Sequence, residues 1–241
     1  MQIEGRNAVR EALGSKMTIN KLMIDKNLQN RKDEIVNLAL LNKIKVEFLP
    51  KALLDKKSIT NHHQGFIAQV VDFSYCTVQE IIEKAKEKNE QPFVVLLDGI
   101  EDPHNFGAII RSCECAGVHG IVIGKNRCCQ VNETVIRTST GAIANMPIAK
   151  VGNIKDAIEE LKSHDVWVYA AEIGGENIYQ QNLNKPIAVV IGSEGHGVRD
   201  VVKSHCDGVI TLPLKGKVNS LNASVACGIV IFEILRQREG R

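Results

Sequence analysis

Residues 187–198 read I-A-V-V-I-G-S-E-G-H-G-V, an unbroken apolar run that ends in a loop with three glycines. A short apolar run followed by turn residues is typical of a strand buried on both faces of a parallel sheet. Gly192, Gly195 and Gly197 permit the loop backbone to come close to a ligand. The order G-x-x-G-x-G differs from the dinucleotide-binding G-x-G-x-x-G, and the loop lacks the lysine of a phosphate-binding loop. The stretch predicts a buried strand with a ligand-approaching loop at its carboxyl end.

Similar apolar runs recur along the chain, at residues 93–97, 120–123, 166–170 and 209–212. Helical patterns lie between them, as at residues 154–161, where four apolar side chains fall on one helical face. Alternation of buried strands with helices favours an open parallel sheet covered by helices on both sides. We therefore predict an α/β fold for this part of the chain.

The first 72 residues form a separate, basic part of the sequence. They carry 12 Lys and Arg and 8 Asp and Glu, a net charge of +4, whereas the remainder carries 18 and 20, a net charge of −2. Expected strands at residues 21–25, 46–49 and 66–71 alternate with expected helices at 28–41 and 50–55, which indicates a small α/β sandwich. A polar connector precedes Thr77, which stands at capping-box spacing from Glu80. We predict a domain at 1–72, a linker at 73–76 and a second domain at 77–241.

The composition limits the kinds of site and partner that the protein can have. The formal net charge of the 241 residues is only +2 and aromatic residues make up 4%. The protein is therefore not expected to bind nucleic acid through a high overall positive charge or by stacking a row of bases on aromatic side chains. Any role with nucleic acid requires a local basic patch. No apolar run reaches the roughly 18 residues of a membrane span, and the N-terminus lacks the apolar segment of a signal peptide.

The seven cysteines indicate a reducing compartment. Their number is odd and they show no disulfide-like framework, which favours the cytoplasm. The pairs Cys113-x-Cys115 and Cys128-Cys129 lack the C-x-x-C spacing of zinc sites, and no paired histidines follow them. We therefore expect no metal site and no association with a membrane.

Three segments follow the ends of predicted strands, where ligands bind in open α/β sheets. After residue 97 comes D-G-I-E-D-P-H-N-F-G-A-I-I-R, which places Asn105 near a helix start and Arg111 six residues further on. The loop at 192–198 contains Glu194. The third segment, residues 212–226, reads L-P-L-K-G-K-V-N-S-L-N-A-S-V-A, a strand end that passes through a polar loop into an apolar helix at 223–235.

Each of these polar residues has both a structural and a functional interpretation. Arg111 is either a surface side chain lying along an apolar helix or a guanidinium that holds phosphate. Glu194 either caps a helix or pairs with a ligand. Ser220 and Asn222 are good N-cap residues, but three hydroxyl or amide side chains within residues 219–222 exceed what one cap requires.

The order of the three segments is more specific than any one of them. N-x-G-x-x-x-R, then I-G-S-E-G-x-G, then L-P-L-x-G-x-x-x-S-L-N-A-S-V-A resembles the three motifs of the SpoU/TrmH family of RNA ribose 2′-O-methyltransferases, in the SPOUT superfamily. The resemblance runs over about 145 residues. G-R-N-A-V at residues 5–9 and H-Q-G at 63–65 resemble N-terminal signatures of the subgroup that modifies a guanosine in the peptidyl-transferase region of 23S rRNA.

This resemblance implies a fold, a cofactor and partners. The fold is a small α/β domain like ribosomal protein L30e, followed by a SPOUT α/β domain with a parallel sheet and a C-terminal trefoil knot. The implied cofactor is S-adenosylmethionine, lined by backbone groups of Gly192, Leu212 and Leu221. The implied partners are RNA, most specifically 23S rRNA, and a second copy of the chain in a homodimer.

The resemblance also implies roles for the polar residues. Asn105 and Asn222 would position the substrate, Arg111 would act at the ribose oxygen and hold phosphate, Glu194 would orient Arg111 or the substrate, and Ser220 would bind the substrate or support its loop. Three alternatives remain: methylation of tRNA or of another rRNA site, a non-catalytic RNA-binding assembly factor, and a nucleotide-dependent oxidoreductase. The missing G-x-G-x-x-G disfavours the last, and the five filled polar positions disfavour the assembly factor.

Overall fold

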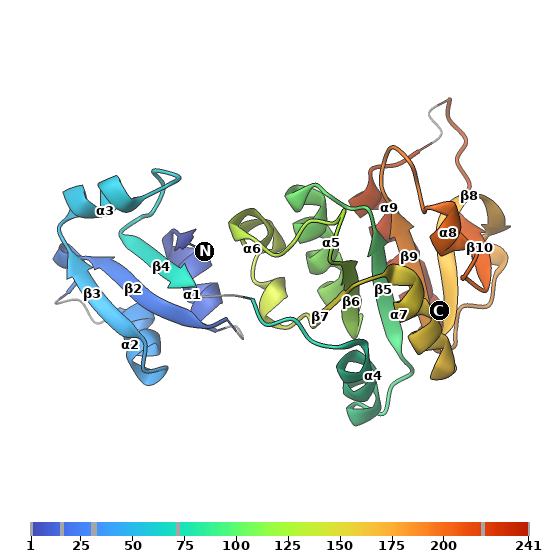
Figure 1. The fold of residues 1–241 in the computed structure, drawn as a ribbon, viewed down its shortest axis with the longest axis horizontal. Helices are drawn as coiled ribbons and strands as arrows, with labels where there is room; N and C mark the ends of the chain where they lie inside the picture. Colours follow the sequence, from blue (N-terminus) through green and yellow to red (C-terminus); the bar gives the residue numbers. More distant parts are fainter. Residues whose placement is uncertain (1, 15–16, 30–32, 71–72, 218–219, 241) are drawn as a thin grey trace. The chain divides into compact units, whose positions relative to one another are not determined.

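The computed structural model describes residues 2–14, 17–29, 33–70, 73–217 and 220–240. The chain divides into two compact units, Met1–Ser74 with Val131–Asn145, and Tyr75–Gln130 with Met146–Arg241 (Figure 1). The sequence gives no sign that residues 131–145 belong with the first unit. The boundaries predicted at 1–72, 73–76 and 77–241 stay predictions.

The first unit is built on a mixed four-stranded sheet. Its strand order is β1-β4-β2-β3, with β4 antiparallel to both β1 and β2, and β2 parallel to β3. The strands are β1 (Gln2–Glu4), β2 (Ile19–Asp25), β3 (Lys45–Leu49) and β4 (Phe66–Val70). The helices are α1 (Arg6–Leu13), η1 (Lys26–Leu28), α2 (Glu34–Leu41), α3 (Lys51–Lys57), α6 (Glu133–Ser139) and η2 (Ala142–Ala144).

Most elements expected in this unit are present, and one is wrong in extent. The three predicted strands and the helix after Pro50 are confirmed. The single helix expected at 28–41 is replaced by the short η1 and by α2, which begins only at Glu34. The reason is local capping, because the Asp33 carboxylate accepts a hydrogen bond from the Ile35 N–H at 2.9 Å and so starts the helix there. Residues 30–32 and 71–72 lie outside the described part.

The second unit contains the predicted parallel sheet. Six parallel strands lie in the order β10-β8-β9-β5-β6-β7. They are β5 (Phe93–Asp98), β6 (Gly120–Gly124), β7 (Ile148–Val151), β8 (Trp167–Asn177), β9 (Ile187–Gly192) and β10 (Gly208–Thr211). All six residues of β5 are buried, as are five of the six in β9, which confirms that these apolar runs are strands covered on both faces.

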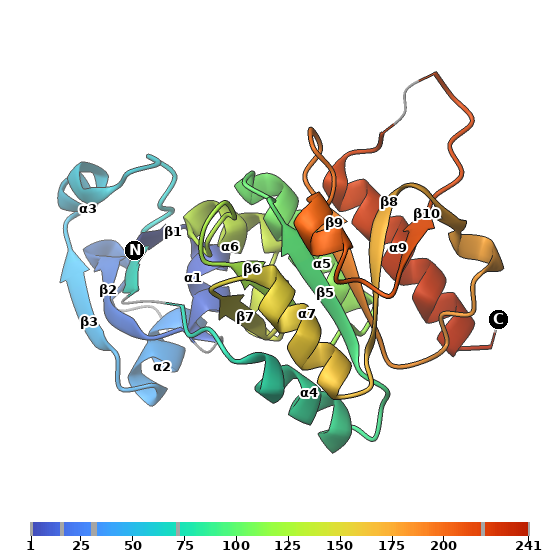
Figure 2. The same ribbon diagram turned by 45° about the vertical axis from the view of Figure 1, so that its right-hand side comes forward.

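Helices cover both faces of this sheet (Figure 2). On one face lie α4 (Val78–Glu87), α7 (Ile154–Ser163) and α8 (Asp200–Lys203), which share one apolar core with alternate residues of the strands. On the other face lie α5 (Pro103–Cys115) and α9 (Ala223–Arg238), which pack against each other. The short η3 (Ile178–Gln180) follows β8. The predicted capping box is confirmed, since Thr77 and Glu80 exchange hydrogen bonds of 2.7 and 3.2 Å at the start of α4.

The strand order creates a crevice at one point of the sheet. The chain runs from β5 outward to β6 and β7, and then returns to place β9 on the opposite side of β5. In the β5–β9 ladder, Asp98 is the register partner of Gly192. Open parallel sheets bind ligands outside the carboxyl ends of strands at such a switch in direction. We therefore expect a ligand-binding site at the loops that follow β5 and β9. Within the described residues, no helix is long and apolar enough to cross a membrane.

Candidate active site

A cavity of about 750 Å³ opens at the carboxyl ends of β8, β9 and β10 and at the start of α9. This volume lies within the range of sites that bind a cofactor-sized ligand. Its lining includes five residues that the sequence singled out: Gly192, Glu194, Leu212, Ser220 and Leu221. Apolar side chains from β9, β10 and α9 line the rest together with several charged groups. The second and third motifs therefore meet around one space.

The loop after β9 is a tight turn that only glycine permits. Ser193 and Gly197 exchange backbone hydrogen bonds of 2.9 and 3.2 Å, which closes the loop on itself. A Cβ on Gly192 would lie 2.0 Å from the carbonyl carbon of Gly197, closer than any real contact. Gly197 adopts φ +61°, a conformation that L side chains rarely take. The glycines thus shape the turn that carries Glu194 into the cavity lining.

Two carboxylates hold the far end of this loop. The Glu172 carboxylate accepts a hydrogen bond from the Val198 N–H at 2.8 Å. Asp98, which is 2% exposed, accepts three from Arg199: from its backbone N–H at 2.9 Å and from its Nε and Nη2 at 2.8 and 2.6 Å. This hydrogen-bonded pairing with Asp98 raises the pKa of the Arg199 guanidinium. This charge-assisted pair, in which Asp98 is buried and Arg199 is partly exposed, fixes the loop to the end of β5.

Replacing Asp98 with asparagine should loosen this loop. The amide offers one acceptor oxygen and turns an N–H₂ group toward the donors of Arg199, so the pair loses its charge and one hydrogen bond. We expect the Kd for S-adenosylmethionine, the cofactor that the motif resemblance implies, to rise about tenfold, or ~1.4 kcal/mol, measured by calorimetry. Asp156→Asn on the exposed side of α7 is the matched control. An unchanged Kd in Asp98→Asn would show that the loop does not need this anchor.

Glu194 joins the first and third motifs. Its Oε1 accepts hydrogen bonds from Asn105 Nδ2 at 2.9 Å, from Asn222 Nδ2, and from the Ala223 N–H at 3.3 Å. Asn222 Nδ2 also lies 2.9 Å from Asn105 Oδ1. Residues separated by 89 and 117 positions in the chain thus form one polar cluster at the start of α9. Charge complementarity adds to the contact, because a carboxylate is stabilised at a helix N-terminus.

Asn222 combines the two functions between which the sequence could not choose. Its Oδ1 caps α9 by accepting from the N–H groups of Ser224 and Val225 at 3.0 and 3.3 Å. Its Nδ2 faces Asn105 and Glu194, so capping and the polar cluster use different atoms of one amide. Ser220 is exposed in the cavity lining. Asn219, the third polar residue of that stretch, lies outside the described residues.

Arg111 lies apart from this cluster. It is exposed on α5, between the buried Ile110 and Cys113. Among the described residues it is not in the lining of the cavity, and the contacts of Glu194 run to Asn105, Asn222 and Ala223 rather than to Arg111. The predicted role of Arg111 stays a prediction.

The residues around the cavity suit a cofactor that is partly apolar and partly charged. Ile191, Leu212 and Leu221 offer apolar surface for a flat ring, and the backbone of residues 192–197 runs along the lining. Gly195 has open space where a Cβ would stand, so a ligand can approach its backbone closely. In the described part of the chain, no three His, Cys, Asp or Glu residues are grouped as metal ligands.

The structure also identifies functional positions that the sequence did not. Asp98 was detectable, because it is the charge that ends the otherwise apolar run of β5 and is the first residue of the segment that leads to the first motif. Glu172 and Arg199 carried no such signal, since their partners Val198 and Asp98 are 26 and 101 residues away.

Comparison with family models gives two matches that together cover most of the chain. Residues 92–232, more than half of the chain, match the SpoU rRNA Methylase family. Residues 2–76 match the family described as RNA 2′-O ribose methyltransferase substrate binding.

Two relatives are similar in sequence to this chain over nearly its whole length. YacO of Bacillus subtilis (strain 168), named for the TrmH family of tRNA/rRNA methyltransferases, is 42% identical over 97% of this chain and 94% of its own. A protein of Staphylococcus haemolyticus (strain JCSC1435), named for the same family, is 40% identical over 98% and 95%.

The fold is shared with solved methyltransferases. The SpoU methyltransferase AviRb from Streptomyces viridochromogenes, crystallised with AdoMet, has a TM-score of 0.81 at 21% identity and covers 99% of this chain and 90% of its own. An AdoMet-bound rRNA methyltransferase from Sinorhizobium meliloti has a TM-score of 0.80 at 22% identity, covering 98% and 87%. At these identities the likeness concerns the fold.

Proposed function

Because the chain belongs to the SpoU rRNA methylase family of RNA methyltransferases, we propose that it methylates a ribose 2′-hydroxyl of RNA, using S-adenosylmethionine. The most specific substrate we propose is a guanosine in the peptidyl-transferase region of 23S rRNA. One observation supports the catalytic part above all others. Asn105, Glu194 and Asn222, one from each motif, meet beside the cavity that Gly192, Leu212 and Leu221 line.

S-adenosylmethionine would occupy the 750 Å³ cavity. Leu212 and Leu221 would hold its adenine and the backbone at Gly192 its polar groups. When bound, this cofactor supplies a methyl group on a positively charged sulfur. The leaving thioether is neutral, so the protein need not provide a general acid. Two tasks remain for the protein: aligning the 2′-oxygen for in-line attack and removing its proton.

The side chains of the three motifs can perform the first of these tasks, the alignment. Arg111 would hold an RNA phosphate through its planar fork and stabilise charge that develops on the 2′-oxygen. An ordinary guanidinium stays protonated and has no acceptor site, so it does not take the proton of the 2′-hydroxyl itself. Asn105 and Asn222, held by Glu194, would position the nucleotide, with Ser220 as a further hydrogen-bonding group on the third loop.

The proposal for the 23S target rests on the N-terminal sequence. Residues 1–72 carry a net charge of +4 and contain the G-R-N-A-V and H-Q-G signatures. Phosphate contacts from such a basic part supply affinity that does not depend on sequence. The test is incubation of the purified protein with unmodified 23S rRNA, 16S rRNA and tRNA. Methyl transfer to 23S rRNA is expected, whereas transfer confined to tRNA would favour the alternative substrate.

The proposed homodimer would cover an apolar stripe on α9. Val225, Ile229 and Phe232 recur along one side of this helix and are 50%, 38% and 47% exposed. The same helix contributes Ala226 and Val230 to the cavity lining. Large apolar side chains aligned in this way mark interaction surfaces, and a two-fold pairing would bury both copies of the stripe.

Replacing Phe232 with aspartate should therefore give a monomer. Placing a charge within the apolar stripe leaves it unpaired in the interface, at a cost of several kcal/mol. Sedimentation or light scattering should show about half the wild-type mass. Leu41→Asp, at a 78% exposed leucine on α2, is the matched control and should leave the mass unchanged. A dimeric Phe232→Asp variant would exclude this surface.

Three further features are proposed on the family resemblance. These are an L30e-like N-terminal domain, a trefoil knot formed by the C-terminal segments, and a cytoplasmic location. The α/β content of the first unit supports the first. The convergence of the loops after β9 and β10 on one cavity supports the second. The cysteine pattern supports the third.

A further inference from the structure

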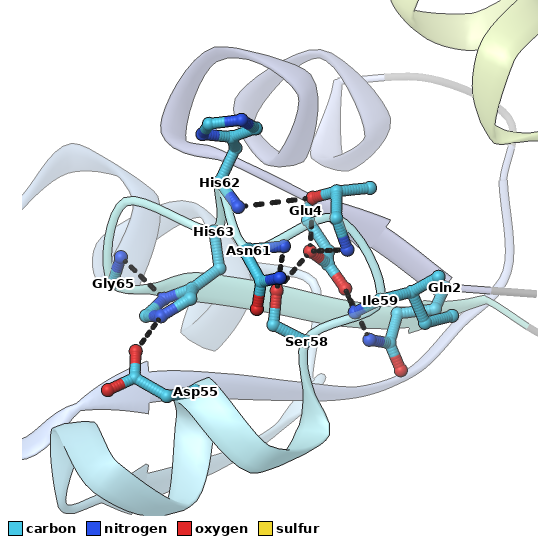
Figure 3. A network of polar contacts seen from close by, with 10 residues as sticks. Gln2, Glu4, Asp55, Ser58, Ile59, Asn61, His62, His63 and Gly65 are labelled. Atoms are coloured by element: carbon cyan, nitrogen blue, oxygen red, sulfur yellow. Dashed lines mark hydrogen bonds and ion pairs between the residues drawn. The ribbon is translucent and has the colours of Figure 1, made fainter.

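In the first unit, a buried carboxylate organises the loop of residues 58–65 between α3 and β4. Glu4, on β1, is 8% exposed. Its carboxylate accepts hydrogen bonds from Ser58 Oγ and the Ile59 N–H, both at 2.6 Å, and from the Thr60 N–H at 3.1 Å. Thr60 Oγ1 and Gln2 Nε2 add bonds of 2.5 and 2.6 Å (Figure 3). One side chain thus fixes the first three residues of the loop.

The Glu4 carboxyl keeps its negative charge at physiological pH. Burial raises the pKa of this carboxyl, but the hydrogen bonds from Ser58, Thr60, Ile59 and Gln2 outweigh it and lower the pKa to about 2. The group is therefore ionised throughout the physiological range. Its restraint on the loop is present above its unfolded pKa of 4.5 and is lost only as the pH falls toward 2.

A second anchor holds the other end of the loop. His63 is 5% exposed. Its Nδ1 accepts a hydrogen bond from the Gly65 N–H at 3.0 Å, and its Nε2 lies 2.8 Å from Asp55 Oδ1. Gln64 Oε1 accepts from the Arg6 N–H at the start of α1, at 3.1 Å. The loop is therefore tied to β1, α1 and α3 and does not depend on a ligand for its shape.

Between the anchors, the loop presents side chains to solvent. Asn61 and His62 are exposed, as is Ile59 at 72%. The imidazole of His62 points away from the Glu4 carboxylate (Figure 3). Asn61 and Gln64 adopt φ values of +58° and +49°, which non-glycine residues take at a cost that the surrounding structure must offset. Such conformations concentrate at binding sites.

The charges beside the loop are positive. Lys56 and Lys57 are exposed in the last turn of α3, directly before Ser58. Of the acidic groups nearby, Glu4 is enclosed by its donors, Glu47 pairs with Lys21, and Asp55, although about half exposed, has one oxygen on His63. The exposed surface therefore combines two cations with an imidazole, an amide and one edge of the Asp55 carboxylate.

We propose that residues 58–65 form a preformed contact surface for an unpaired segment of the RNA substrate, with Glu4 as the residue that sets the loop's conformation. Lys56 and Lys57 meet phosphates, and His62 and Asn61 meet an unstacked base. Unpaired bases are recognised by stacking on aromatic rings and by hydrogen bonds to their edges, and a rigid loop avoids the cost of ordering on binding. This inference rests on RNA being the substrate, as proposed above.

The test measures binding of full-length protein to a transcript of the peptidyl-transferase region of 23S rRNA. His62→Ala is expected to raise the Kd about tenfold through lost stacking, with the salt dependence unchanged. Lys56→Ala should weaken binding and lower the slope of log K against log salt by about one. Lys45→Ala, an exposed lysine on β3, is the matched control and should change neither.

Glu4→Gln tests the positioning role. An amide cannot accept from all the donors that the carboxylate satisfies, so amide hydrogen exchange in residues 58–65 should accelerate and the RNA Kd should rise at least fivefold. The Kd for S-adenosylmethionine should stay the same, which separates the effect from general misfolding. If this variant does not fold, His62→Ala and Lys56→Ala still show whether residues 58–65 contact the RNA.

The outcomes distinguish this inference from the proposed function. Unchanged RNA affinity in His62→Ala and Lys56→Ala, with wild-type protein methylating the transcript, would overturn the loop assignment and leave the activity standing. Absence of methylation by the wild type would instead reject the function, while the binding data would still report on the loop.

Discussion

Replacing Arg111 with alanine should reduce methyl transfer by about 10²- to 10³-fold, the usual cost of removing one group that stabilises charge in a transition state. The fold should be unaffected, because the side chain is exposed on α5. S-adenosylmethionine should bind as before, since Arg111 is absent from the cavity lining described here. Single-turnover methylation with saturating RNA measures the effect on chemistry, and calorimetry measures cofactor binding.

Two further variants show whether the geometry of the guanidinium matters. Arg111→Lys keeps the charge but loses the planar fork, so it should recover only a small part of the activity. Lys86→Ala removes an exposed positive charge from α4 and should have no effect. Near wild-type turnover in Arg111→Ala would remove Arg111 from the mechanism and leave its exposed position on α5 as ordinary surface.

Replacing Glu194 with alanine should lower turnover by about 10²-fold, the lower end of the effects seen for groups that orient a reacting centre. Three N–H donors converge on Glu194 Oε1, from Asn105, Asn222 and Ala223. Without this acceptor, the two amides lose their common partner and their fixed orientation toward the substrate. Because Glu194 is exposed, water can replace the lost hydrogen bonds, and the melting temperature should change little.

A double-mutant cycle tests whether these residues work as one unit. If Asn105 acts through the same cluster, Asn105→Ala and Glu194→Ala together should cost little more than either alone. Glu194→Gln retains an acceptor oxygen and should fall between wild type and Glu194→Ala. Fully additive losses in the cycle would mean that the two side chains act independently.

The elements of the second unit were predictable because their burial leaves a simple pattern. A strand covered by helices on both faces must be apolar at every position, as β5 and β9 are. The first unit is harder, because β1 has three residues and α1 only eight. Elements this short give no period to detect. The predicted start of α2 was wrong because a single hydrogen bond, from the Ile35 N–H to Asp33, decides where the helix begins, and one such contact leaves no pattern in the sequence.

The site was predictable only as far as its motifs extend. Order along the chain indicated that the segments of Asn105, Glu194 and Asn222 cooperate, and the structure brings these side chains into contact. The anchors Asp98–Arg199 and Glu172–Val198 depend on strands that meet only after folding, and no spacing in the sequence encodes them. The same holds for Glu4, whose partners in the loop, Ser58 and Ile59, lie more than 50 residues away.

The central claim is that methyl is transferred to a ribose 2′-oxygen of RNA, and nucleoside mass spectrometry tests it most directly. Unmodified 23S rRNA would be incubated with the purified protein and S-adenosylmethionine carrying a deuterated methyl group, then digested to nucleosides. We predict labelled 2′-O-methylguanosine from a single position in the peptidyl-transferase region. Label found only on bases, or none on 23S rRNA or any tRNA, would contradict the account.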